Sequence, residues 1–124
     1  LGNHIILPGV ITDSERQWLF KNCDVFVFPS LTEGFGFPVL EAMQFGKPVV
    51  MSNRTSLPEI AGDSGFFFPS YEAPEMARAV MNAAQAFQNN PSRAIQSRRH
   101  AESFSWQATA QQYADVYRTL LKGI

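Results

Sequence analysis

Two glutamates, Glu33 and Glu41, flank a Gly-Phe-Gly-Phe-Pro turn in the stretch FPSLTEGFGFPVLEAMQFGKPVV, with seven residues between them. Carboxylates accept hydrogen bonds from hydroxyl groups, and a bond to a charged acceptor contributes about 1.5–3 kcal/mol. Gly34 and Gly36 permit backbone conformations, and a close approach of a ligand, that side chains would forbid. The stretch therefore has the groups needed to hold a hydroxyl-bearing molecule against the main chain.

The residues after the turn predict the start of a helix. Pro38 suits a first helical position and Gly46 suits a stop, so we expect a helix between them with Glu41 in its first turn. The amides of Val39 and Leu40 would then lack internal partners. Such a terminus attracts an anion by about 0.3–1 kcal/mol, and by up to ~2 kcal/mol when partly buried. A phosphate between two hydroxyl-binding carboxylates has the layout of a nucleotide sugar. The residues alone are also consistent with a site that binds no ligand. In that case the glycines would only allow close packing, and Glu41 would only stabilise the helix dipole.

The rest of the chain alternates short apolar runs with helical patterns. Strands are predicted at residues 4–7, 25–28, 48–51 and 65–68. Helices are predicted at 14–22 with Asp13 as N-cap, 38–46, 57–61, 73–89, 92–102 and 106–122. Continuously apolar strands between helices indicate an α/β fold, a doubly wound parallel sheet of about four strands with helices on both faces and a helical C-terminus. Ligands of such sheets bind at the carboxyl ends of the strands, where Glu33 follows the second one.

The composition argues against a nucleic-acid-binding protein and against a membrane-spanning one. The 124 residues suffice for one domain, and the net charge of −1 with scattered Lys and Arg argues against a nucleic-acid partner. The apolar runs are too short to cross a bilayer. Cys23 is the one cysteine; we expect a buried structural thiol and a reducing, cytoplasmic compartment, with a peripheral position at the membrane as an option. The chain enters its first apolar run without an initiator Met, which predicts a piece of a longer protein.

The glutamate-flanked stretch resembles the signature of group 1 (family 4) retaining glycosyltransferases with GT-B architecture, whose mark is two glutamates separated by seven residues. The resemblance continues through PGVITDSERQWLFKNCDVFVFPS upstream, and through SLPEIAGDSGFFF and FSW downstream. It implies transfer of a sugar from a nucleoside-diphosphate sugar to an acceptor hydroxyl, in glycan biosynthesis. It also implies that neither a metal nor another cofactor is needed, and the chain has no Asp-x-Asp pair.

The resemblance implies roles for individual residues. Glu33 would contact hydroxyls of the transferred sugar beside the reacting carbon, and Glu41 would hold the ribose. Backbone amides would bind the sugar and diphosphate of the donor; they belong to Gly34, Phe35, Gly36, Phe37, Val39 and Leu40. Other candidates are Ser30 (ligand contact or turn formation), Gly9 and Val10 (near the base) and Glu59 (bracing of the loop, or ligand contact).

Two features of the family are not matched. One is the Arg-Lys pair on the diphosphate, for which Arg54 is no substitute; we expect Arg54 to be a solvated loop residue. The other is the N-terminal domain that binds the acceptor, whether a glycan, a lipid or a small molecule. Residues 1–124 are therefore expected to be a single, truncated donor-binding domain without its first strands, inactive by itself. The alternative is a nucleotide-sugar-binding module without catalysis.

The expected sheet order, 3-2-1-4-5-6, has a structural consequence. The strand at 25–28 would keep one unpaired edge, and the apolar face of the helix at 106–122 would be bare. Exposed strand edges invite association. These features predict self-association or domain swapping of the chain.

Overall fold

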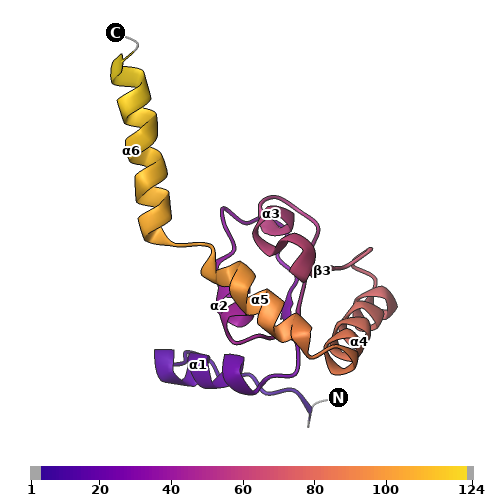
Figure 1. The fold of residues 1–124 in the computed structure, drawn as a ribbon. Helices are drawn as coiled ribbons and strands as arrows, with labels where there is room; N and C mark the ends of the chain where they lie inside the picture. Colours follow the sequence, from indigo (N-terminus) through magenta and orange to yellow (C-terminus); the bar gives the residue numbers. More distant parts are fainter. Residues whose placement is uncertain (1–3, 123–124) are drawn as a thin grey trace.

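A computed structural model describes residues 4–122 of the chain, which form a parallel sheet between two layers of helices (Figure 1). The strands β1 (Phe26–Phe28), β2 (Val49–Met51) and β3 (Phe66–Phe67) lie in the order β1-β2-β3. Both strand pairs are parallel. The helices are α1 (Asp13–Asn22), α2 (Phe37–Gln44), α3 (Leu57–Ala61), α4 (Ala73–Asn89), α5 (Ser92–Glu102) and α6 (Trp106–Lys122), with a 3-10 turn η2 (Gly62–Ser64) after α3. The predicted α/β class with a parallel sheet is confirmed.

The central strand β2 divides the core between the two faces of the sheet. Val49 and Met51 pack with residues of α2, α3 and α5, whereas Val50 packs against α4 on the other face. All three side chains are fully buried. Burial of a side chain of this size stabilises the fold by about 1.5–3 kcal/mol. The uninterrupted apolar run at β2 thus reflects a strand that is covered on both sides.

The predicted strand at residues 4–7 is wrong, and the described sheet has three strands rather than four. Residues 5–11 follow an irregular, mostly exposed path, and Leu7 is 88% exposed. A strand needs a neighbour to receive its backbone hydrogen bonds, and no strand of the described residues lies beside this segment. Within residues 4–122, β1 pairs only with β2, so its other edge is unpaired as expected.

The N-cap of α1 is Thr12, not Asp13 as predicted. Its hydroxyl accepts from the amide of Glu15 at 3.3 Å, and Glu15 Oε2 accepts from the Thr12 amide at 2.8 Å. This reciprocal pair is a capping box. Hydrogen bonds from the Thr12 backbone and side chain lower the pKa of Glu15. Asp13 instead lies in the first turn, where its charge favours the helix dipole.

Phe20 anchors α1 to the rest of the molecule. Its ring is buried and packs at centroid distances of 5.2 Å from Phe26 and 6.1 Å from Phe45. Cys23, which caps the end of α1, is half-buried rather than fully buried, and its thiol donates to the Phe20 carbonyl at 3.6 Å. Burial raises the pKa of the Cys23 thiol, which favours the protonated, structural form.

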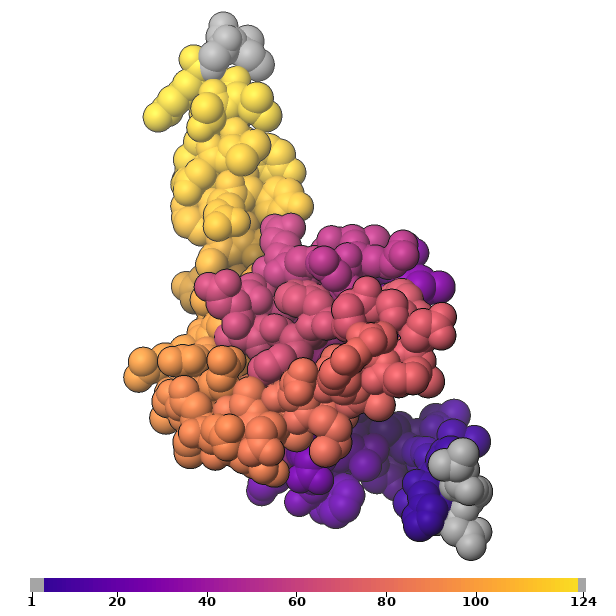
Figure 2. Space-filling view, turned by 90° about the vertical axis from the view of Figure 1, so that its right-hand side faces the viewer, coloured from indigo at the N-terminus to yellow at the C-terminus, as the bar shows by residue number. Residues whose placement is uncertain are grey.

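The last helix has the predicted bounds, and beyond Trp106 at its start its side chains are largely exposed. It extends away from the body of the protein (Figures 1 and 2), and none of its residues is buried. Tyr113, Tyr117 and Leu120 are each about 60% exposed. The apolar face is therefore bare, as expected, and self-association remains a prediction. Among residues 4–122, no helix combines the length and the apolar character that a bilayer crossing requires.

Candidate functional site

The loop that carries Glu33 lies at the carboxyl end of β1 and leads directly into α2. Glu33 is half-buried, and its amide donates to Oγ1 of Thr55 at 3.2 Å. Thr55 belongs to the loop that follows β2, the neighbouring strand. The predicted position of Glu33, above the carboxyl ends of adjacent parallel strands, is confirmed.

Side chains of the loop after β2 hold the Glu33 loop in place. Ser52 Oγ donates to the Ser30 carbonyl at 2.5 Å, and Ser52 is almost fully buried. Ser56 Oγ lies 2.8 Å from the Phe35 carbonyl and 3.3 Å from the Glu33 carbonyl. Ser56 occupies the N-cap position of α3 but makes no side-chain cap bond there, because its hydroxyl is used on the neighbouring loop. Sequence reasoning missed these contacts; the only signal was the polar run that follows β2.

Thr55 has an unusual backbone conformation in this bracing loop. Its φ is +51°, the only positive value at a non-glycine position among the described residues. A β-branched residue rarely adopts this region, and such strain costs on the order of 1–3 kcal/mol. The conformation lets Oγ1 accept from the Glu33 amide while it donates to the Arg54 carbonyl at 2.9 Å. The strained residue is thus the one through which the loop after β2 holds the loop that carries Glu33.

The two glycines of the turn serve different purposes. Gly36 is buried, has a φ of +109° and forms the N-cap of α2; a Cβ there would lie 2.8 Å from Cδ2 of Leu57. Gly34 is exposed, and a Cβ built on it would meet no atom within 4 Å. The fold therefore requires glycine at Gly36, whereas the space beside Gly34 is open. A missing side chain beside open space leaves room for a ligand at the backbone.

The amides of the turn are only partly as predicted. The expectation that the Val39 amide lacks an internal partner is wrong, since it donates to the Gly36 carbonyl at 3.0 Å. The side chains of Val39 and Leu40 belong to the core, so the backbone is the only part of either that could meet a ligand. Within residues 4–122, no hydrogen-bond acceptor is found for the amides of Gly34, Phe35 and Phe37, all three of which are exposed residues.

Glu41 lies farther along the helix than predicted. Because α2 begins at Phe37, Glu41 is in the second turn rather than the first. Its half-buried carboxylate forms an ion pair with Arg16 of α1, in which Oε1 meets Nη1 of Arg16. Arg16 also contacts Asp13, with 3.2 Å between Nη2 and Oδ1. Glu41 raises the pKa of Arg16 through this hydrogen bond and through its charge. Sequence reasoning gave Arg16 no role.

Aromatic rings connect the turn to the C-terminal helices. The rings of Phe35 and Phe37 are 4.7 Å apart; Phe37 lies 5.9 Å from Trp106, and Phe35 lies 6.2 Å from Phe104. Phe37 is 51% exposed and Trp106 is 78% exposed. The Phe104–Trp106 segment therefore lies beside the glycine turn although it is distant in sequence.

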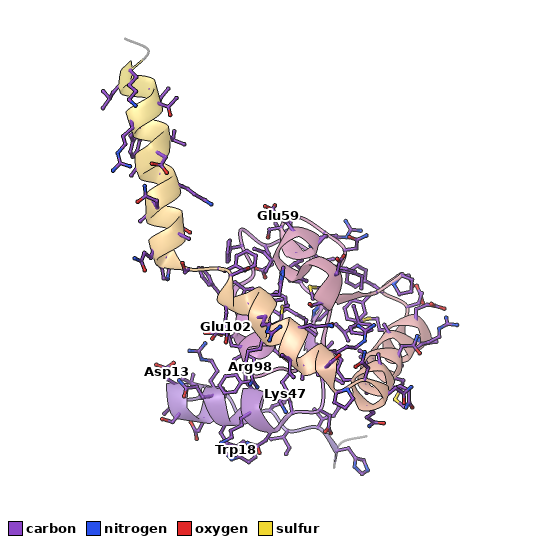
Figure 3. All side chains as sticks on the ribbon, in the orientation of Figure 1. Asp13, Trp18, Lys47, Glu59, Arg98 and Glu102 are labelled. Atoms are coloured by element: carbon purple, nitrogen blue, oxygen red, sulfur yellow. The ribbon has the colours of Figure 1, made fainter. Side chains whose placement is uncertain are left out.

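The secondary candidates differ in their surroundings. Ser30 Oγ donates to the Thr32 carbonyl at 3.1 Å, which fits turn formation. Gly9 and Val10 are exposed in the irregular segment before α1, not at the end of a strand. Figure 3 shows Glu59 on α3, where it is exposed, and within residues 4–122 its carboxylate makes no hydrogen bond that would brace the loop. Arg54 is exposed as predicted, with its guanidinium 5.9 Å from the centre of the Tyr71 ring.

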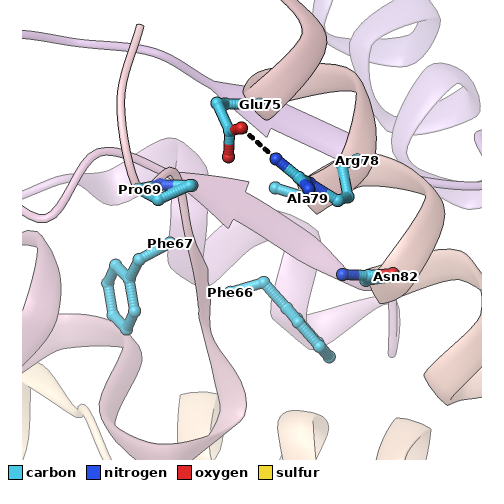
Figure 4. Close-up of a pocket in the computed structure, with 7 residues that line it drawn as sticks. All are labelled: Phe66, Phe67, Pro69, Glu75, Arg78, Ala79 and Asn82. Atoms are coloured by element: carbon cyan, nitrogen blue, oxygen red, sulfur yellow. Dashed lines mark hydrogen bonds and ion pairs between the residues drawn. The ribbon is translucent and has the colours of Figure 1, made fainter. Parts of the chain in front are cut away.

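A hollow of about 280 Å³ lies elsewhere, between β3 and the first half of α4 (Figure 4). Its lining residues are Phe66, Phe67, Pro69, Glu75, Arg78, Ala79 and Asn82. An ion pair between Glu75 and Arg78 borders it. None of the residues predicted to bind a ligand lines this hollow. In the described part of the chain, no three His, Cys, Asp or Glu side chains gather as a metal site would require.

Comparisons with known proteins agree with the motif and the fold. Residues 1–101 match the family model for glycosyl transferases group 1. The chain is 36% identical over 115 residues to the O-antigen chain mannosyltransferase B of Escherichia coli, a match that covers 90% of this chain and 29% of that protein. It is 32% identical over 119 residues to a D-inositol 3-phosphate glycosyltransferase of Paenarthrobacter aurescens, covering 94% of this chain and 29% of that protein.

A solved structure is similar in fold. The sucrose-phosphate synthase of Thermosynechococcus elongatus superposes with a TM-score of 0.73 at 27% sequence identity, over 99% of this chain and 32% of that one. The chain thus spans less than a third of the length of each of these three proteins. The family expected from Glu33, Glu41 and the turn between them is confirmed. This chain belongs to the group 1 glycosyltransferase family.

Proposed function

We propose that the full-length protein is a retaining glycosyltransferase and that residues 1–124 bind its nucleoside-diphosphate-sugar donor. One observation carries the proposal. In a chain of the group 1 family, Glu33, the glycine turn and Glu41 form one continuous loop–helix unit at the carboxyl end of β1. Parallel α/β sheets bind their ligands at this edge.

The diphosphate is assigned to the glycine turn. The exposed amides of Gly34, Phe35 and Phe37 have no acceptor within the described residues, and they precede or open α2. Free main-chain amides that gather in a turn at a helix start form a site for anions. The open space beside Gly34 admits a phosphate to the backbone. Leu40 remains a candidate, whereas the amide of Val39 is already used by Gly36.

The two glutamates are assigned to the two ends of the donor. Glu33, fixed by Thr55 and Ser56, contacts hydroxyls of the transferred sugar beside the reacting carbon. Glu41 is 32% exposed and accepts from the ribose. In the proposed reaction, the leaving phosphate takes the proton of the acceptor hydroxyl as that oxygen attacks from the same face. The configuration of the sugar is therefore retained, without a metal ion.

The acceptor is assigned to a domain outside these residues. The Escherichia coli relative is named as an O-antigen chain mannosyltransferase. By this analogy we place the protein in bacterial surface glycan synthesis, in the cytoplasm or peripherally at its membrane. The alternative is a module that binds nucleotide sugars without transferring them.

Sugar transfer by the full-length protein tests the proposal. Ligand-observed NMR against a panel of UDP-, GDP- and ADP-sugars first identifies the donor. Product analysis then shows whether the sugar reaches an acceptor with its anomeric configuration retained. Donor binding without any transfer across a panel of glycan and lipid acceptors would favour the binding module, and a product of inverted configuration would contradict retention.

A glutamate substitution tests the role of Glu33. Glu33→Gln should lower kcat while the donor KM changes little, because the group acts at the reacting sugar. Loss of a charged hydrogen bond of about 1.5–3 kcal/mol corresponds to about 10- to 150-fold in kcat. Glu102→Gln, at an exposed glutamate that ends α5, is the matched control and should leave kcat unchanged. An unchanged kcat for Glu33→Gln would refute this role.

A further inference from the structure

The ion pair between Arg16 and Glu41 connects α1 to the proposed donor site. The two residues are 25 positions apart in sequence, and their side chains are 40% and 32% exposed. Nη1 of Arg16 meets Oε1 of Glu41, while Nη2 of Arg16 is directed to Asp13. The two arms of one guanidinium therefore contact two carboxylates, one on its own helix and one on α2.

The way α1 packs against the core places Arg16 beside Glu41. Arg16 and Phe20 are four positions apart, so they lie on the same face of the helix. Phe20 is buried against Phe26 and Phe45, which follows the end of α2, and this contact turns that face toward α2. The capping box of Thr12 fixes the start of the same helix. Arg16 therefore reaches Glu41 from a helix that is held at its start and at its buried face.

The ion pair occupies only part of the Glu41 carboxylate. Among the described residues, every contact of this carboxylate uses Oε1. Each carboxylate oxygen can accept more than one hydrogen bond, so Oε2 is available to a hydroxyl donor. A carboxylate fixed through one oxygen presents the other in a defined direction, which lowers the entropy lost when a ligand binds.

We propose that Arg16 is a positioning residue that holds Glu41 through Oε1 so that Oε2 accepts a hydrogen bond from the ribose of the donor. This inference rests on the proposed function, in which Glu41 is the ribose acceptor. Arg16 acts through Glu41 and not on the donor itself. Its effect is therefore the same for the free nucleoside diphosphate as for the sugar nucleotide, because both contain the same ribose.

A purely structural ion pair would behave differently. Pairs exposed to this degree contribute little to stability, so removal of Arg16 should barely change the unfolding temperature. A structural role also predicts no special relation between Arg16 and the hydroxyls of the ligand. Donor affinity measured with and without those hydroxyls separates the two roles.

The test is calorimetric titration of the full-length protein with UDP, GDP and ADP, followed by the 2′-deoxy and 3′-deoxy forms of the nucleotide that binds best. Glu41→Ala should weaken binding by about 10- to 150-fold, the equivalent of a charged hydrogen bond. Arg16→Ala should weaken it by about three- to tenfold, as part of that loss. The double variant should bind no more weakly than Glu41→Ala, since Arg16 acts only through Glu41.

Two further measurements isolate positioning from folding. The effect of Arg16→Ala should disappear with at least one of the deoxy nucleotides, and in steady-state transfer it should raise the donor KM while kcat stays the same. Arg16→Lys keeps a cation and should restore part of the affinity. Arg78→Ala is the control, because it removes another exposed ion pair, the one with Glu75 on α4. This variant should bind the nucleotide with the affinity of the unchanged protein.

The outcomes separate the two hypotheses. If Glu41→Ala weakens binding while Arg16→Ala does not, or if the two losses add in the double variant, the positioning role is refuted and the proposed function stands. Should Arg16→Ala fail to fold, Arg16→Lys with the deoxy nucleotides gives the same decision. If Glu41→Ala itself binds normally, the ribose assignment under the proposed function fails.

Discussion

The two glycines of the turn allow a matched test of how this site is built. Gly36→Ala would add a Cβ 2.8 Å from Cδ2 of Leu57, at a residue whose φ is +109°. Leu57 is fully buried, so its side chain has little freedom to move away. Gly34→Ala adds the same methyl group two residues earlier, where no atom lies within 4 Å.

The expected effects differ in size and in kind. The left-handed conformation costs a residue with a Cβ about 1–2 kcal/mol, and overpacking a core costs about 1–3 kcal/mol. Gly36→Ala should therefore lose about 2–5 kcal/mol of a total domain stability of about 5–15 kcal/mol. Gly34→Ala should change stability by no more than about 0.5 kcal/mol, because it touches nothing. It should instead weaken donor binding, since its methyl group enters the space assigned to the diphosphate.

Two assays on the full-length protein check this pair of variants. Differential scanning calorimetry should show a lower unfolding temperature for Gly36→Ala and an unchanged one for Gly34→Ala. Titration with the preferred nucleoside diphosphate should show weaker binding for Gly34→Ala. The reasoning is refuted if Gly36→Ala unfolds at the same temperature as the unchanged protein. It is refuted also if Gly34→Ala binds the nucleotide normally.

Further predictions concern the groups that hold the site and its neighbouring helix. Ser56→Ala removes the hydroxyl that donates to the carbonyls of Glu33 and Phe35, and should cost about 0.5–1.5 kcal/mol in urea unfolding; an unchanged midpoint would show that the bracing contributes nothing. Thr12→Ala should destabilise α1 by about 0.5–2 kcal/mol through loss of the cap, read from the same unfolding curves. Because the folded pKa of Glu15 is lowered from 4.5, its stabilising contribution is present above that pH and is lost as the pH falls through the lowered value. Glu15→Gln removes the titrating group, so unfolding temperatures measured between pH 6 and pH 3 should fall less in Glu15→Gln than in the unchanged protein, and equal slopes would contradict the assignment.

The sequence by itself determined most of the elements and the place of Glu33 and its glycine turn between β1 and α2. The helices at 73–89, 92–102 and 106–122 have the predicted bounds, and the apolar runs at 25–28, 48–51 and 65–68 contain the three strands. These features depend on periodicity, caps and turn residues, which are local properties of the chain. The spacing of Glu33 and Glu41 around the glycine turn likewise identified the family before any fold was known, because the motif is contiguous.

Contacts between distant segments were decided only by the tertiary structure. The apolar run at 4–7 has strand composition, but a strand exists only where another strand receives its hydrogen bonds, and none lies beside it within the described residues. The partners of Glu33 and Glu41, namely Thr55, Ser56 and Arg16, are 22 to 25 positions away in sequence. Nothing in the local pattern distinguishes Arg16 from any other exposed arginine. Arg16 contacts Glu41 because Phe20 packs α1 against the core. Such packing depends on residues from the whole chain rather than on a local pattern.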